Sequence, residues 1–153
     1  METPYLGIHQ TGSRPLVALS LGATGDAADV AHRRGVRAAR LQAIQADIEA
    51  HLLDPDLSTI WIAARHGISA RYLRALFADR QMTFADFVTD RRLLVVWRRL
   101  VNPNTLCDAI STIAYECGFN DLSWFNRAFR RRFGMTPSEV RGLMFERSTK
   151  QHW

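Results

Sequence analysis

Arginine, asparagine and serine side chains recur on one face of each of two stretches that the sequence predicts to be helical. If Phe125 marks the buried direction of the second stretch, at about 100° per residue, the side chains on the opposite face are Ser123, Asn126, Arg127 and Arg130. Leu73 marks the same direction in the first stretch, whose opposite face carries Arg71, Arg74, Ala75 and Ala78. The polar members of both sets can hydrogen-bond base edges and backbone oxygens in a major groove. The chemistry that they predict is recognition of nucleic acid.

The basic residues are almost entirely arginine. Of the 20 lysine and arginine residues only Lys150 is a lysine, and the formal net charge at pH 7 is +5. The planar guanidinium pairs with phosphate oxygens and guanine edges in a bidentate geometry that lysine cannot form. This composition favours a polyanionic partner, and double-stranded DNA is the one that we expect.

Neither a metal site nor a catalytic site is expected. Two cysteines, Cys107 and Cys117, are too few for a disulfide framework or a four-ligand zinc site, and the five histidines show no ligand spacing. His66 and Cys117 each precede a glycine, Gly67 or Gly118, so we expect them to serve a turn or to pack in the core. The sequence therefore predicts no enzyme, no cofactor and no metal.

Helical periodicity continues from about Ala38 towards the C-terminus, and no alternating strand pattern of useful length occurs. Capping residues mark the expected helix starts: Ser58, Ser69, Thr83 with Asp86, and Thr136 with Pro137 and Glu139. In the helix that follows Ser58, we expect Ile60, Ala63 and Ala64 to face inward. A long helix should run from Thr83 to Val101. The predicted fold class is all-α, with about seven helices.

The chain divides into a loosely ordered N-terminal arm over 1–37, a helical domain over 38–147 and a tail over 148–153. Residues 1–40 hold five of the nine glycines, and within them only 16–21 and 27–40 have helical character. The longest uncharged apolar stretch, Pro15 to Ala23, is shorter than the ~20 residues that span a bilayer. We expect a cytoplasmic protein without membrane contact, because this stretch lacks the flanks of a signal peptide.

An internal repeat organises the helical part. Ile62–Ser69 aligns with Ile113–Asn120, and after one inserted residue Tyr72–Phe77 aligns with Trp124–Phe129. Each copy has an alanine four residues before a glycine, and a large apolar residue six or seven residues after that glycine. The small alanine lets two helices cross closely, and glycine suits the left-handed turn between them. The repeat predicts two helix-turn-helix units joined by the long helix.

Residues 41–142 resemble the DNA-binding domain of the AraC/XylS family of bacterial transcriptional regulators. The resemblance rests on Ile113-Ala114-Tyr115-Glu116-Cys117-Gly118-Phe119, Trp124-Phe125, Phe129, Phe133-Gly134-Met135-Thr136-Pro137 and Arg141. It implies two recognition helices placed in successive major grooves on one face of the DNA. It also implies sequence-specific regulation of transcription, usually activation, through contact with RNA polymerase. The effector is unknown.

By position, the resemblance assigns the contacts with DNA to both recognition helices. The groove-facing residues are Arg71, Arg74 and Ala75 in the first unit, and Leu122, Ser123, Asn126 and Arg127 in the second. Ser69 and Asn120, at the starts of the two helices, are expected near phosphates. Arg130 and Arg131, with Arg132, are expected to contact the phosphate backbone after the second helix.

Three features depart from the family pattern. The loop Asp79–Thr83 is one residue short and lacks a glycine, and the bulky Val96 and Trp97 stand where small or polar residues are usual. In addition, the 40 residues before the module are too few for an effector domain, so we interpret the chain either as a truncated regulator, whose arm is the remnant of that domain, or as a short single-domain member. Two other functions stay open: a helical protein-interaction module without DNA binding, and the DNA-binding part of a DNA-repair protein.

Overall fold

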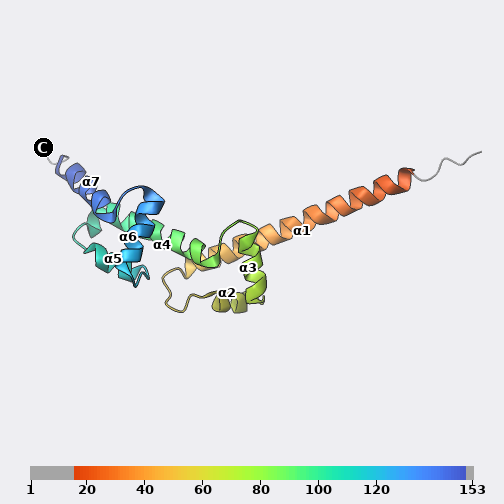
Figure 1. The fold of residues 1–153 in the computed structure, drawn as a ribbon, viewed down its shortest axis with the longest axis horizontal. Coiled ribbons are helices and arrows are strands. Elements are labelled where there is room, and N and C mark those ends of the chain that lie inside the picture. The colour runs from red at the N-terminus through yellow and green to blue at the C-terminus, as the bar shows by residue number, and fades with distance from the viewer. Residues whose placement is uncertain (1–15, 151–153) are drawn as a thin grey trace, which may run out of the picture. The chain divides into compact units, whose positions relative to one another are not determined.

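The computed structural model describes the backbone of residues 16–150 and the surroundings of the side chains of residues 25–146. All regular secondary structure in the described part is helical, so the predicted all-α class is confirmed (Figure 1). Over residues 16–150 there are seven α-helices, one short 3-10 helix and no strand. Their bounds are α1 Leu16–Ala50, α2 Thr59–Arg65, α3 Ala70–Ala78, α4 Phe84–Val101, η1 Pro103–Thr105, α5 Ile110–Glu116, α6 Leu122–Phe133 and α7 Pro137–Lys150.

Packing divides the chain into two parts, Met1–Ala39 and Arg40–Trp153. Residues 16–37 of the predicted arm are helical, including 22–26, for which the sequence indicates no helical character. Alanine, leucine and arginine dominate this stretch, and their helix propensity outweighs glycines that cost ~1 kcal/mol each. The side chains of residues 25–36 are all exposed. Residues 1–15 of the predicted arm and 151–153 of the predicted tail lie outside the described residues.

The part from Arg40 onward contains two separate hydrophobic cores, and each is built around one of the two helix-turn-helix units. The first core takes side chains from α1, α2, α3 and the first turns of α4: Leu41, Ile44, Ile48, Leu52, Ile62, Ala63, Leu73, Leu76, Phe77, Phe87 and Val88. The second takes them from the rest of α4 and from α5, α6 and α7: Leu93, Val96, Leu100, Ile113, Ala114, Cys117, Phe119, Phe125, Ala128, Phe129 and Val140. The helix α4 thus contributes to both cores.

The predicted starts of the helices carry the expected hydrogen bonds. Ser58 Oγ accepts from the Trp61 amide at 3.2 Å, and Thr83 and Asp86 form a reciprocal capping box at the start of α4. Thr136 and Glu139 bond in the same reciprocal manner at the start of α7. These local signals are short-range, which is why the sequence alone identifies them.

Two predicted inward-facing residues of α2 face solvent instead. Ile60 is 74% exposed and Ala64 is exposed, whereas Ile62 and Ala63 are buried. Ile60 and Ala64 lie two residues to either side of Ile62, which places both about 160° away from the buried direction. Only Ala63 of the three residues predicted to face inward does so.

The bulky residues of the linking helix lie in the second core. Val96 is fully buried, and the Trp97 ring stacks on Phe129 with centroids 6.0 Å apart and lies 4.7 Å from the Phe133 ring. The second core therefore accommodates both of these departures from the family pattern. No described helix is long and apolar enough to cross a membrane.

Candidate nucleic-acid interface

The two copies of the repeat form turns with the same hydrogen bonds. After α2, the Gly67 amide donates to Ala64 O at 3.1 Å and the Ile68 amide to Ala63 O at 3.0 Å. After α5, the corresponding bonds run from Gly118 to Tyr115 O at 2.9 Å and from Phe119 to Ala114 O at 3.0 Å. Gly67 and Gly118 have φ of +60° and +83°, the left-handed conformation that this helix ending requires. Each turn leads directly to a recognition helix, α3 or α6.

The two recognition helices begin on different kinds of cap. Ser69 caps α3 as predicted, because its Oγ accepts from the Tyr72 amide at 3.1 Å. In the second unit the cap is Asp121, whose carboxylate accepts from the Trp124 amide at 2.9 Å. Asn120 is exposed and lies one residue before that cap. The sequence reasoning missed Asp121, although an aspartate immediately before a helix is a standard start signal.

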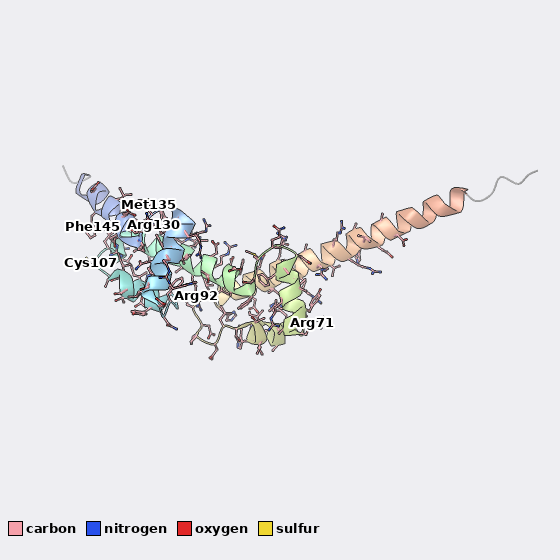
Figure 2. The ribbon with its side chains drawn as sticks, in the orientation of Figure 1. Arg71, Arg92, Cys107, Arg130, Met135 and Phe145 are labelled. Carbon is pink, nitrogen blue, oxygen red and sulfur yellow. The ribbon has the colours of Figure 1, made fainter. Side chains whose placement is uncertain are left out.

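The exposed face of α3 is the one predicted from the position of Leu73. Leu73, Leu76 and Phe77 are buried, while Arg71, Arg74 and Ala75 are exposed. Arg71 lies on α3 as labelled in Figure 2. The structure therefore brings the predicted residues of the first unit together on one solvent-facing side of one helix.

Most of the predicted residues of α6 also share one exposed face. Phe125, Ala128 and Phe129 are buried, and the exposed residues are Ser123, Asn126, Arg127, Arg130 and Arg131. Leu122 is the exception, since it is partly buried and packs against the second core. Its position three residues before Phe125 turns it only about 60° from the buried direction. Leu122 thus has a packing contact in the second core, and its contact with the groove stays a prediction.

The third arginine of the Arg130-Arg131-Arg132 run has a partner within the protein. Arg132 Nε forms an ion pair with Asp90 on α4, and its guanidinium lies 5.2 Å from the centre of the Phe133 ring. Arg132 follows Phe125 by seven residues, or about two turns, so it points towards α4 rather than away from it. Arg132 thus links α6 to the linking helix, and the phosphate contacts of the three arginines stay predictions.

A cluster around Asp47 fixes the first helix-turn-helix unit against α1. Arg65 donates from Nε and Nη2 to the two Asp47 carboxylate oxygens, both at 2.9 Å, and His66 Nε2 lies 3.0 Å from Oδ2. His51 Nδ1 lies 3.1 Å from Oδ1, and the His51 ring meets the Trp61 ring edge-on at 5.1 Å. The hydrogen bonds from Arg65 hold the pKa of Asp47 below its usual value of 3.8. His66 therefore serves the turn, as expected.

The loop that follows α3 replaces a glycine by glutamine. Gln81 has a φ of +55°, while Gly134, which follows α6, has a φ of +76°. The amides of Gln81 and Met82 donate back to Ala78 O and Phe77 O at 2.9 and 3.4 Å. The short loop thus reaches the same left-handed ending as the second unit, at the cost of strain in a residue with a side chain.

The remaining candidates for chemistry do not form a reactive centre. Cys117 is fully buried, and this burial raises the pKa of its thiol, whereas Cys107 is exposed. In the described part of the chain, no group of three or more histidine, cysteine or acidic side chains could hold a metal ion. What the arrangement offers chemically is a set of hydrogen-bond donors on the exposed face of α3 and another on the exposed face of α6.

Comparison with known proteins gives a family for this arrangement. A family model described as a helix-turn-helix domain matches residues 62–142. The transcriptional activator RhrA of Rhizobium meliloti (strain 1021) is 36% identical over 104 residues, which cover 68% of this chain and 33% of RhrA. The regulatory protein SoxS of Escherichia coli (strain K12) is 33% identical over 102 residues, which cover 66% of this chain and 92% of SoxS. The matched part thus spans about a third of RhrA but nearly all of SoxS.

Solved structures share the fold. The crystal structure of a probable AraC family transcriptional regulator from Rhodopseudomonas palustris CGA009 has a TM-score of 0.60 at 28% identity, covering 69% of this chain and 96% of that one. A DNA-binding transcriptional dual regulator from Escherichia coli K-12 also has a TM-score of 0.60, at 20% identity, covering 67% and 95%. At that identity, the second likeness supports the fold alone.

Proposed function

The chain belongs to the AraC/XylS-type helix-turn-helix family of transcriptional regulators, and we propose that it reads a bipartite site in double-stranded DNA with α3 and α6. The observation that carries this proposal is the repeated geometry. Two turns with identical hydrogen bonds each present a helix whose exposed face carries arginine, and α4 joins the two units. One such unit is common among helical proteins, but two in register within one chain are what a two-groove reader needs.

Within this proposal, the exposed side chains divide into base and phosphate contacts. Arg71 and Arg74 on α3 and Asn126 and Arg127 on α6 extend towards base edges, where arginine pairs with guanine and asparagine with adenine. The shorter side chains Ala75 and Ser123 allow α3 and α6 to approach the groove. Ser69 and Asn120 at the helix starts, together with Arg130 and Arg131 in the last turn of α6, meet phosphates.

The proposal extends to the organisation of the whole chain. Residues 38–147 form the DNA-binding domain, and 1–37 and 148–153 contribute no contact to bases. The protein acts in the cytoplasm as an activator that contacts RNA polymerase, and it requires neither a cofactor nor catalytic residues. RhrA, whose name describes a transcriptional activator, supports the direction of regulation.

Selection of bound duplexes from random DNA tests this function. We expect the full chain to enrich two short motifs at a constant separation. A protein-interaction module would enrich no sequence and would show no retention on heparin. Enrichment of a single motif, or of none, would overturn the proposal.

A further inference from the structure

We propose that Arg92 fixes the distance and angle between the two recognition helices, and thereby determines which separation of the two half-sites the protein accepts. This inference rests on the proposed reading of a bipartite site. It concerns a positioning residue on α4 that is not part of the exposed faces of α3 and α6.

The two cores leave a gap in α4, and Arg92 lies in it. The last residue of α4 in the first core is Val88, and the first in the second core is Leu93. The intervening turn, 89–92, is the only part of α4 between the residues that belong to each core. The half-buried Val95 packs against both cores. A bend or rotation of α4 at this turn would change the relative position of α3 and α6.

Arg92 bonds to the backbone of both units. Its Nε donates to Leu52 O at 3.1 Å, just beyond the end of α1 in the first unit, and its Nη1 donates to Gly118 O at 3.3 Å, in the turn that leads to α6. Figure 2 places the Arg92 label between the part that contains α2 and α3 and the part that contains α5 and α6. Backbone carbonyls cannot rotate away as side chains do, so one guanidinium joins two rigid points.

The fit of Arg92 against the second turn is close. A Cβ added to Gly118 would lie 2.7 Å from both Cζ and Nη1 of Arg92, whereas a Cβ added to Gly67 would meet no atom within 4 Å. Glycine at 118 thus serves two purposes, because it adopts φ of +83° and admits the guanidinium. The burial that accompanies this fit lowers the pKa of Arg92, but an arginine stays charged in proteins.

The neighbours of Arg92 hold the same turn to one unit each. Arg91 Nε lies 2.8 Å from Glu49 Oε1 on α1, and Asp90 pairs with Arg132 on α6. The side chains of these pairs are one-third to one-half exposed, so each ion pair on its own contributes little to holding the turn in place. Arg92 differs because its two bonds cross from one unit to the other, which makes it the residue to test.

The test compares four forms of the full chain: the unsubstituted protein, Arg92→Met, Gly118→Ala and Gly67→Ala. Arg92→Met keeps an unbranched side chain of similar length and removes the donors. Gly118→Ala displaces the guanidinium, and Gly67→Ala imposes similar backbone strain in the first turn without touching Arg92. An effect that arises only from a weakened fold should therefore also appear in Gly67→Ala.

The first readout needs no DNA. With Cys107 replaced by serine, spin labels are attached to Ala78→Cys on α3 and Ser123→Cys on α6, both of which are exposed positions. We expect a narrow distance distribution in the unsubstituted form and in Gly67→Ala, and a broadened or shifted one in Arg92→Met and Gly118→Ala. Equal distributions in all four forms would overturn the role of Arg92, whether or not the protein binds DNA.

The second readout measures affinity for duplexes in which the separation of the half-sites is lengthened or shortened by one base pair. For the unsubstituted protein and Gly67→Ala, we expect a change of one base pair in the separation to lower the affinity about tenfold. A loss of this size is within the range that a single mismatched base pair causes. For Arg92→Met and Gly118→Ala, we expect the same change in separation to lower the affinity less than about threefold. We also expect both variants to bind the duplex with the optimal separation more weakly than the unsubstituted protein does. An equal loss of affinity in all four forms, when the separation changes by one base pair, would contradict the proposal. Absence of binding by the unsubstituted protein would count against the proposed function, while the distance readout would still decide the role of Arg92.

Discussion

At the scale of single residues, we expect the proposed interface to separate side chains that read bases from side chains that contact the DNA backbone. Arg74 is exposed in the middle of α3, and Asn126 holds the aligned position on α6. Arg130 is exposed in the last turn of α6, on the side opposite the core. Base contacts carry sequence information, whereas phosphate contacts mainly fix the position of the protein.

Arg74→Ala is therefore expected to weaken binding to the selected site by ~1–3 kcal/mol while changing the affinity for random DNA little. The matched variant is Arg130→Ala, which should weaken binding to both DNAs by similar factors. It should also make the slope of log K against log salt shallower by roughly one. Titrations of both duplexes at fixed salt measure these effects. Equal losses on both duplexes with Arg74→Ala would identify Arg74 as a phosphate contact.

Asp47 predicts how stability depends on acid. The hydrogen bonds from Arg65 lower the pKa of Asp47 in the folded state, so its contribution to stability is present above the unfolded value and is lost as pH falls through the folded value. Asp47→Asn should destabilise the protein by about 1 kcal/mol at pH 7, since much of the cluster is close to solvent. This difference should shrink as pH falls below about 4.

Urea denaturation at pH 7 and at pH 3 measures the effect of Asp47→Asn on the free energy of unfolding. Asp56→Asn, in the exposed turn after α1, is the control and should change stability little at either pH. A difference between the Asp47 variant and the unsubstituted protein that stays constant from pH 7 to pH 3 would contradict the proposed role of this ionised carboxylate.

At the scale of elements, the two units reach similar geometry with different loops. Gln81 adopts a left-handed φ of +55°, which costs a residue with a side chain ~1–2 kcal/mol. Glycine at this position would remove that strain, but its greater freedom in the unfolded chain would offset part of the gain in stability. We therefore expect Gln81→Gly to stabilise the protein by about 0.5–1 kcal/mol. Thermal unfolding should show a rise in Tm of a few degrees.

The control for this prediction is Gly134→Ala in the second unit. A Cβ at Gly134 meets no atom within 4 Å, so the substitution adds only backbone strain and should destabilise the protein by about 1 kcal/mol. A loss of stability with Gln81→Gly would show that its side chain holds the short loop in place.

The sequence predicted those features that depend on neighbours along the chain. The caps, the repeat and the faces of α3 and α6 follow from local spacing, and the structure has them. Ile60 and Ala64 were predicted to face inward and are exposed, although the helical angle of each relative to Ile62 already indicates this direction. The long extent of α1 and the bonds of Arg92 depend on the balance of weak propensities and on tertiary contacts, which periodicity does not report.

At the scale of the whole molecule, the charge of the interface predicts how binding responds to salt. The arginines exposed on or beside the recognition helices are Arg71, Arg74, Arg80, Arg127, Arg130 and Arg131, while Arg132 is engaged by Asp90. If about four or five of them neutralise phosphates, log K should fall with log salt at a slope of roughly −3.5 to −4.5. Affinities measured from low to moderate salt give this slope. A slope near zero with binding retained would show that the arginines do not contact the backbone.

The central claim is that one chain reads DNA with two helices held by α4. Footprinting of the full chain on its selected duplex tests this claim most directly. The account predicts two protected segments about one helical turn apart, ~10–10.5 base pairs, on one face of the duplex and without two-fold symmetry. A single protected segment, or a palindromic footprint made by a tight dimer, would contradict it.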